Sequence, residues 1–278
     1  SEVKKVMDLT GIGMGTWNIG EDPKKKKDEI ASLRYGLDNG IRIIDTAEMY
    51  GEGKSEKLIG EAIKGYDRSQ MYIISKFYPY HATPDLERKS LEETLTRLNT
   101  DYLDLYLLHW RGSHRLSDTV CGLEELKKEG LIRQWGVSNF DTSDMQELFS
   151  VPNGEKCYAN EDLYNLDHRG VEYDLLPWQK ENQVNFIGYS PFNSGEGNTI
   201  RITHNLKAVA RAHDATPHQI MLAWALRSGD VLSIPKAAKV THMKENLAAQ
   251  RIKLTDDELR LINSDFMQPT AKQPLATI

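Results

Sequence analysis

The stretch IRIIDTAEMYGEGKSEKLIGEAIKGYDRSQMYIISK, residues 41–76, contains a complete structural unit. It opens with a short run rich in β-branched residues, continues with a helical pattern over residues 55–64, and ends in a second run that begins at Met71. A strand, a helix and their two loops need about 30 residues, which is the spacing between the two runs. The stretch therefore predicts a β–α–β unit.

The same spacing recurs on both sides of this unit. Further β-branched or aromatic runs begin near Gly11, Tyr102, Ile132, Cys157, Val184 and Val231. The other helical patterns cover residues 30–37, 86–98, 119–128, 143–149, 173–181, 206–213, 220–227 and 256–262. Eight strand–helix units of this length close naturally into a barrel. We therefore expect an α/β fold of the (β/α)8 TIM-barrel class, with residues 1–278 as a single domain.

An open, doubly wound parallel sheet is the alternative arrangement of such units. That fold usually has a glycine-rich GxGxxG turn directly after its first strand. Here the first run reads GIGMGTW, residues 11–17, and its glycines do not have that spacing. The closed barrel is therefore the preferred prediction.

The composition argues against several classes of protein. Of the 278 residues, 39% are hydrophobic and 27% are charged, which is ordinary for a globular protein. A net charge of −6 argues against a general nucleic-acid binder, because such binding depends on neutralising phosphates with Lys and Arg. The most apolar run, residues 102–110, is far shorter than the roughly 20 residues of a membrane span.

The cysteines and the N-terminus bear on the cellular compartment. Cys121 and Cys157 offer neither a disulfide framework nor the paired spacing of a zinc site. The first residues lack the apolar stretch of a secretory signal. We therefore expect a cytoplasmic, metal-free protein that binds no membrane or nucleic acid and is a monomer or a weak homo-oligomer.

Polar residues stand at the ends of three successive predicted strands. The second strand ends in Asp45 and runs on to Tyr50, the third ends in Lys76, and the fourth ends in His109. The carboxyl ends of barrel strands meet at one mouth, where active sites are built. We therefore expect these four side chains to converge.

These four residue types suit proton donation to a carbonyl group that accepts a hydride. A tyrosine has an unperturbed pKa of about 10 and donates poorly unless a cation such as Lys76 stabilises its phenolate. Asp45 would keep that lysine charged and fixed. His109 could hydrogen-bond the carbonyl oxygen as negative charge develops there. The sequence thus predicts a reductase with Tyr50 as the acid.

Seven motifs extend this pattern over essentially the whole chain: GxGTW at 13–17, DTAEMYGEG at 45–53, SK at 75–76, LLHW at 107–110, GVSN at 136–139, YSP at 189–191 and IPK at 234–236. In residues, order and spacing they resemble the aldo-keto reductases. Within that family the chain is most similar to the bacterial methylglyoxal-reductase-like branch.

The resemblance implies the catalytic tetrad Asp45, Tyr50, Lys76 and His109, with Tyr50 as general acid in reduction and base in oxidation. It implies NADPH or NADP⁺ as cofactor, with NADH as a weaker alternative. The substrates implied are small aldehydes and ketones, among them α-ketoaldehydes such as methylglyoxal, or aldoses. Substrate-binding positions would be Trp17, Tyr50, Tyr78, His109 and Trp110.

The resemblance also implies where the cofactor would lie. Tyr189 would stack on the nicotinamide, with Ser138 and Asn139 holding its carboxamide. The other implied cofactor-binding positions outside the adenosine end are Gly15, Thr16, Trp17, Asp45, Glu161, Ser190, Pro191, Phe192 and Ser194.

Glu161 departs from the family, which commonly has a glutamine at this position. A carboxylate can accept a hydrogen bond from the carboxamide but cannot donate one. An ionised Glu161 would also favour the cationic oxidised ring. We therefore expect Glu161 to tighten NADP⁺ relative to NADPH.

The adenosine end of the resemblance lies in residues 234–246, which include Ile234 and Pro235. Lys236 would pair with the 2′-phosphate, while Glu245 and Asn246 would reach the adenine from the next helix. Two residues differ from many family members: Ala237 replaces a serine and His242 replaces an arginine. We call the residues around the 2′-phosphate the clamp. We expect NADPH to be preferred over NADH, but by less than in family members whose clamp has the serine and the arginine.

Two other functions fit parts of the pattern. Lys76 could be the Schiff-base lysine of an aldolase, although Asp45 beside it would favour the charged, unreactive amine. A non-catalytic member could bind the cofactor and report redox state to a partner, although the intact tetrad argues against this.

Overall fold

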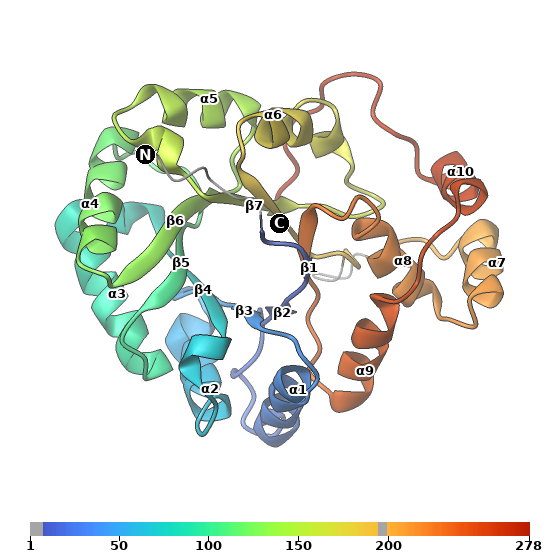
Figure 1. Cartoon of the computed structure of the whole chain (residues 1–278), viewed down its shortest axis with the longest axis horizontal. Helices are drawn as coiled ribbons and strands as arrows, with labels where there is room; N and C mark the ends of the chain where they lie inside the picture. Colours follow the sequence, from blue (N-terminus) through green and yellow to red (C-terminus); the bar gives the residue numbers. More distant parts are fainter. Residues whose placement is uncertain (1–7, 194–198) are drawn as a thin grey trace.

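The computed structural model describes residues 8–193 and 199–278, and within them nine parallel strands form a nearly closed barrel with helices around it (Figure 1). The strand order is β1-β9-β8-β7-β6-β5-β4-β3-β2. The strands are β1 (Gly11–Ile12), β2 (Met14–Gly15), β3 (Ile43–Asp45), β4 (Tyr72–Phe77), β5 (Leu103–Leu108), β6 (Ile132–Ser138), β7 (Ala159–Leu163), β8 (Asn185–Tyr189) and β9 (Val231–Ile234). The (β/α)8 barrel class is confirmed.

The ninth strand arises because the first predicted strand is divided at Gly13. Its first half, β1, pairs with β9, and its second half, β2, pairs with β3. The Gly13 amide donates to the carbonyl oxygen of Ser233 at 2.9 Å. A Cβ atom on Gly13 would lie 2.9 Å from Cγ2 of Ile43, so a larger residue would push the strands apart. The two halves together act as one strand that closes the barrel.

The helices follow the strands as the spacing predicts. They are α1 (Lys26–Asp38), α2 (Lys54–Ala62), α3 (Pro84–Leu98), α4 (Leu116–Lys128), α5 (Thr142–Ser150), α6 (Leu175–Glu181), α7 (His204–Ala212), α8 (Pro217–Ala225), α9 (Val240–Ala249) and α10 (Asp256–Asp265). The long last interval holds both α7 and α8, and α7 and α10 lie outside α8 (Figure 1). Pro217 opens α8 behind a Thr216–Gln219 capping box. The helical periodicity did not predict α9. This helix was implied only by the resemblance at residues 234–246, which places Glu245 and Asn246 on a helix.

Alternation along the strands places the polar residues above an apolar floor. Leu107, Ile187 and Leu232 belong to a buried apolar cluster inside the barrel, together with Ile74. Because strand side chains alternate between two faces, the residue two positions beyond Ile74 also faces inward, and that residue is Lys76. The mouth of the barrel is therefore lined by the last inward-facing residue of each strand.

None of the helices in the described part of the chain is long and apolar enough to cross a membrane.

Candidate active site at the carboxyl ends of the strands

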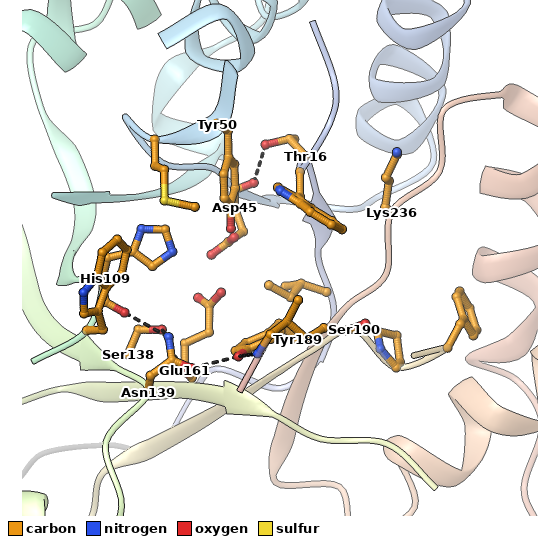
Figure 2. A pocket seen from close by; sticks show the side chains of 18 residues that line it. Thr16, Asp45, Tyr50, His109, Ser138, Asn139, Glu161, Tyr189, Ser190 and Lys236 are labelled. Atoms are coloured by element: carbon orange, nitrogen blue, oxygen red, sulfur yellow. Dashed lines mark hydrogen bonds between the residues drawn. The ribbon is translucent and has the colours of Figure 1, made fainter. Parts of the chain in front are cut away.

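A cavity of about 330 Å³ opens at the carboxyl ends of the strands (Figure 2). It brings together most of the positions singled out in the sequence. Those that line it are Gly15, Thr16, Trp17, Asp45, Tyr50, His109, Trp110, Ser138, Asn139, Glu161, Tyr189, Ser190, Pro191, Phe192, Ile234 and Lys236. Met49 and Ile278 also line it and were not singled out. The only feature of the sequence that points to Met49 is its position directly before Tyr50 in the DTAEMYGEG motif.

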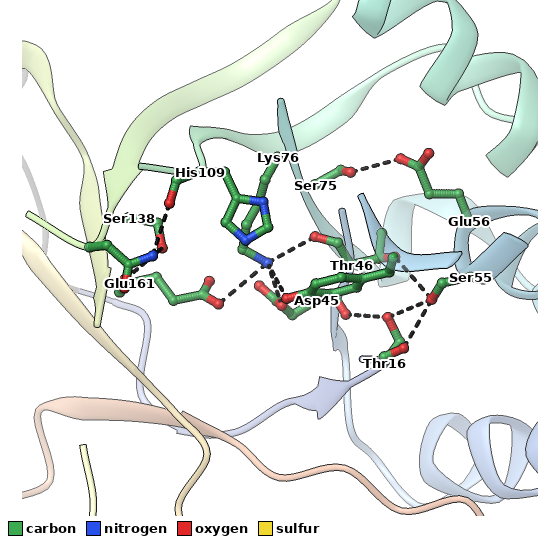
Figure 3. Close-up of polar contacts among 12 residues, drawn as sticks. Thr16, Asp45, Thr46, Ser55, Glu56, Ser75, Lys76, His109, Ser138 and Glu161 are labelled. Atoms are coloured by element: carbon green, nitrogen blue, oxygen red, sulfur yellow. Dashed lines mark hydrogen bonds and ion pairs between the residues drawn. The ribbon is translucent and has the colours of Figure 1, made fainter. Parts of the chain in front are cut away.

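Lys76 is the centre of the polar contacts behind this cavity (Figure 3). Its Nζ donates to Oδ1 of Asp45 at 2.7 Å, to the carbonyl oxygen of Thr46 at 2.9 Å and to the hydroxyl of Tyr50 at 3.3 Å. The Oε1 atom of Glu161 also lies 3.3 Å from Nζ. The lysine is 1% exposed, so these contacts replace its hydration.

These contacts fix the charge of Lys76 and act on Tyr50. Burial alone would lower the pKa of Lys76, but the nearby carboxylate of Asp45 raises it well above its usual value, so the ammonium stays charged. Burial raises the pKa of Tyr50, and the opposing effect of Lys76 does not cancel it. Lys76 acts in the expected direction, since its charge and its hydrogen bond both lower the pKa of Tyr50, but burial has the larger effect. The phenol is protonated and able to donate.

The turn after β3 holds Tyr50 in place. The short helix η1 (Tyr50–Gly53) contains three successive residues with positive φ, namely Gly51, Glu52 and Gly53. Gly53 packs against Arg97, and a Cβ atom there would lie 2.7 Å from the arginine side chain. The glycines of this motif thus allow a sharp left-handed turn that an ordinary residue would strain.

A buried ion pair supports the same turn from behind. Arg97 Nη2 lies 2.7 Å from Oε1 of Glu56, and Glu56 Oε2 accepts from the hydroxyl of Ser75 at 2.8 Å. Ser75 precedes Lys76 and points to the opposite face of β4, as strand alternation requires. Through Glu56 and Arg97, Ser75 of the SK motif therefore links α2 and α3 to the strand that carries Lys76.

His109 faces Tyr50 across the cavity. The two ring centroids are 5.9 Å apart in an edge-to-face arrangement. Burial, together with the charge of Lys76, lowers the pKa of His109 to about 3, so the imidazole is neutral at physiological pH. A neutral imidazole still has one N–H group that can donate to a carbonyl oxygen.

Ser138, Asn139 and Tyr189 are connected on the other side of the cavity. The hydroxyl of Tyr189 donates to Oδ1 of Asn139 at 2.7 Å, and Nδ2 of Asn139 donates to the carbonyl oxygen of His109 at 3.0 Å. Ser138 donates to the carbonyl oxygen of Glu161 at 2.7 Å. Asn139 has a φ of 58°, a conformation that asparagine adopts more easily than most residues. These contacts fix the ring of Tyr189 as a flat wall.

Glu161 differs from the expectation of an ionised carboxylate. It is 1% exposed on β7, and burial and the neighbouring Asp45 raise its pKa well above its usual value, with Lys76 opposing them. Burial and Asp45 therefore favour the neutral, protonated form of this carboxyl group. The physical reason is that one ammonium does not compensate two carboxylates that are buried away from solvent.

Several predicted positions do not reach the cavity. Tyr78 does not line it, since its ring stacks on Tyr80, with centroids 4.6 Å apart, and meets Trp110 edge-on at 6.0 Å. The clamp residues Pro235, Ala237, His242, Glu245 and Asn246 also lie outside its lining. Ser194 falls outside the described residues.

The residues that line the cavity match parts of a nicotinamide dinucleotide. It has a flat aromatic wall at Tyr189, an unpartnered buried Oε2 atom on Glu161, and an ammonium at Lys236 toward its other end (Figure 2). An aromatic face, a polar group and a cation match a nicotinamide ring, its carboxamide and a phosphate. Among the described residues no cluster of His, Cys, Asp or Glu could hold a metal ion.

Comparisons with known proteins agree with this geometry. A model of the Aldo/keto reductase family matches residues 11–264. Methylglyoxal reductase YeaE of Escherichia coli (strain K12) is 42% identical over 271 residues, covering 97% of this chain and 95% of that protein. An aldo/keto reductase of Klebsiella pneumoniae solved with NADP and acetate has a TM-score of 0.93 and 43% identity, covering 96% of this chain and 95% of that one. An aldo-keto reductase structure from the same organism with NADPH has a TM-score of 0.92 and 42% identity, covering 96% and 94%. The chain belongs to the aldo/keto reductase family of NADP(H)-dependent oxidoreductases.

Proposed function

We propose that this protein reduces small α-ketoaldehydes of the methylglyoxal type, and other small aldehydes and ketones, to alcohols with NADPH. The observation that carries the proposal is a protonated phenol, Tyr50, which lies 3.3 Å from a buried ammonium and lines the cavity opposite a neutral histidine. The relative named methylglyoxal reductase supports this choice of substrate class.

The proposed chemistry uses the tetrad as follows. When bound, NADPH supplies the hydride. Tyr50 donates its proton to the carbonyl oxygen, and Lys76 stabilises the phenolate that remains, helped by its 2.7 Å contact with Asp45. The N–H group of His109 donates to the same oxygen while negative charge builds on it. In oxidation the same groups act in reverse, with Tyr50 as base.

The cofactor would lie along the cavity from Tyr189 to Lys236. We place the ring on Tyr189, the carboxamide at Ser138, Asn139 and Glu161, and the phosphates along Ser190, Pro191 and Phe192. Lys236 would hold the 2′-phosphate, and α9 would bring Glu245 and Asn246 to the adenine. NADH would bind more weakly, because it lacks the phosphate that Lys236 contacts.

The size of the cavity supports small substrates. Binding sites for small molecules span roughly 300 to 1,000 Å³, and this cavity of about 330 Å³ is shared between substrate and nicotinamide. Trp17, Met49 and Trp110 give its walls an apolar character that suits a methyl or short alkyl group. Tyr78 would act on the substrate only through Trp110, against which it packs.

The cellular setting is also part of the proposal. Both cysteines are free thiols, which suits a reducing cytoplasm. We also propose a monomer or a weak homo-oligomer.

The test is the loss of NADPH absorbance with purified protein and methylglyoxal, beside a panel of small aldehydes and aldoses. Reduction of methylglyoxal with a kcat/KM above that for aldoses is expected. Binding of NADPH without turnover of any carbonyl would contradict an enzyme and favour a redox-reporting module. Borohydride trapping of a substrate on Lys76 would instead support an aldolase, which the buried ion pair with Asp45 opposes.

A further inference from the structure

Two carboxyl groups share one ammonium at the base of the cavity. Nζ of Lys76 is 2.7 Å from Asp45 and 3.3 Å from Glu161, and all three side chains are about 1% exposed (Figure 3). The three residues come from β3, β4 and β7, so the barrel brings them together rather than the local sequence. With every group ionised the cluster would carry a net negative charge.

A proton on one carboxyl group removes that charge. Below the cluster lies the apolar floor of the barrel, which provides no compensating dipole. Oδ2 of Asp45 and Oε2 of Glu161 are buried and have no hydrogen-bond partner among the described residues. A proton held by one carboxyl group and hydrogen-bonded to the other would satisfy both, as in other pairs of adjacent carboxyl groups.

The contact distances indicate which group holds the proton. Asp45 is closer to the ammonium and is therefore better stabilised as a carboxylate than Glu161. Tyr50 and Tyr189 are the other titratable groups that face Glu161. His109 interacts with Lys76. All three side chains are neutral at pH 7. Lys76 is therefore the only cation near Glu161 in the described structure, and it is already paired.

We propose that Glu161 is a proton switch that responds to the redox state of the cofactor. It keeps its proton in the empty protein and beside a neutral reduced nicotinamide, and it releases the proton when a cationic oxidised nicotinamide lies against it. The O–H bond of Glu161 breaks, its electron pair stays on the carboxylate, and the proton leaves to solvent. The inference rests on the proposed cofactor site.

The switch has a thermodynamic consequence. Because binding of NADP⁺ expels a proton, its affinity should increase with pH, by up to about tenfold per pH unit while the free protein is protonated and the complex is not. Affinity for NADPH should lack this increase. Titration of the 2′-phosphate is common to both cofactors and cancels in the comparison.

The experiment measures protons released per cofactor bound. NADP⁺ and NADPH are titrated into the protein by calorimetry at pH 7 and pH 8, in buffers of different ionisation enthalpy. The wild type should release close to one more proton with NADP⁺ than with NADPH. In Glu161→Gln this difference should vanish, while both cofactors still bind.

The matched control is Glu87→Gln. Glu87 is another buried carboxyl group, on α3 and facing α4, and burial with the nearby Glu125 raises its pKa to about 9. It does not line the cavity, so this variant should release protons as the wild type does.

Two calorimetric results would overturn the inference. Equal proton release with both cofactors in the wild type would do so, and so would a difference that persists in Glu161→Gln. If neither cofactor binds to the wild type, the proposed function fails as well. In the first two outcomes, by contrast, the cofactors bind and only the proton switch fails. Should Glu161→Gln not fold, a pH-independent dissociation constant for NADP⁺ in the wild type, over the same range, would decide against the switch.

Discussion

The two ends of the proposed cofactor site are built in different ways. At the catalytic end, Lys76 is buried and contacts four acceptors, and His109 is 8% exposed. At the adenosine end, Lys236 and His242 are exposed, and neither side chain makes a hydrogen bond or ion pair within the described residues. The catalytic end is thus complete before any ligand arrives, whereas the clamp needs an anion to complete it.

This difference reflects the task of each end. Groups that act on developing charge must be held in place before the reaction, because reorganising them would raise the barrier. A phosphate clamp has only to attract and hold a charge, so an exposed lysine suffices. Substitutions at the catalytic end should therefore alter turnover, and substitutions in the clamp should alter affinity.

The largest effect is expected for Tyr50→Phe, which removes the proton donor and keeps the ring. General acid catalysis is worth roughly 100- to 10,000-fold, so kcat for methylglyoxal should fall by a factor in that range. The NADPH dissociation constant, measured by fluorescence titration, should remain that of the wild type. A variant with more than about a tenth of wild-type turnover would show that Tyr50 is not the acid.

The second-largest loss of turnover is expected for His109→Ala. Loss of an oxyanion-stabilising donor lowers kcat by roughly 100- to 1,000-fold. Since its pKa is lowered to about 3, His109 loses its proton only as pH rises through about 3 and is neutral at every pH above it. Steady-state rates from about pH 5 to pH 9 should therefore have the same profile shape in wild type and variant. An inflection near neutral pH that disappears in His109→Ala would contradict the preorganised neutral ring.

Lys236→Ala tests the clamp end. A charge-assisted phosphate contact contributes roughly 1.5 to 3 kcal/mol, so the NADPH dissociation constant should rise by about 10- to 100-fold. The NADH dissociation constant and kcat should change little. The matched control is Lys239→Ala, at the start of α9, which should have a smaller effect. If Lys239→Ala weakens NADPH more than Lys236→Ala does, the clamp assignment is wrong.

His242→Ala should give the smallest effect, a loss of a few-fold in NADPH affinity. The exposed imidazole can add one N–H donor to a 2′-phosphate that Lys236 already contacts in the proposed site. NADH affinity should stay that of the wild type, because NADH lacks this phosphate. The measurement is the ratio of the two dissociation constants by fluorescence titration. A ratio equal to that of the wild type would remove His242 from the clamp.

The sequence was informative where the chemistry depends on position along a strand. Asp45, Lys76 and His109 lie within one residue of the carboxyl ends of successive strands, and parallel strands in a barrel must bring those ends together. The alternation of side chains then fixes which face each residue occupies. This is why the four side chains could be expected at one mouth: Asp45, Tyr50 and His109 line the cavity there, and Lys76 contacts Asp45 and Tyr50 behind it.

The sequence was less informative where side chains meet across the barrel. Glycine spacing alone did not show that the first strand divides at Gly13, because its two halves pair with different strands, β9 and β3. Tyr78 follows a reactive strand end, yet packing against Tyr80 turns it away from the cavity. Ile278, by contrast, is far from every motif and still reaches the lining.

Glu161 shows most clearly where prediction from the sequence ends and the tertiary structure is needed. The sequence by itself determined that a carboxyl group replaces the family's usual glutamine on the strand proposed to carry the carboxamide site. Its charge depends on the tertiary structure, which buries the group and places Asp45 and Lys76 beside it. The physical reason is that ionisation depends on the distance to other charges and on burial, and neither quantity is encoded in local sequence.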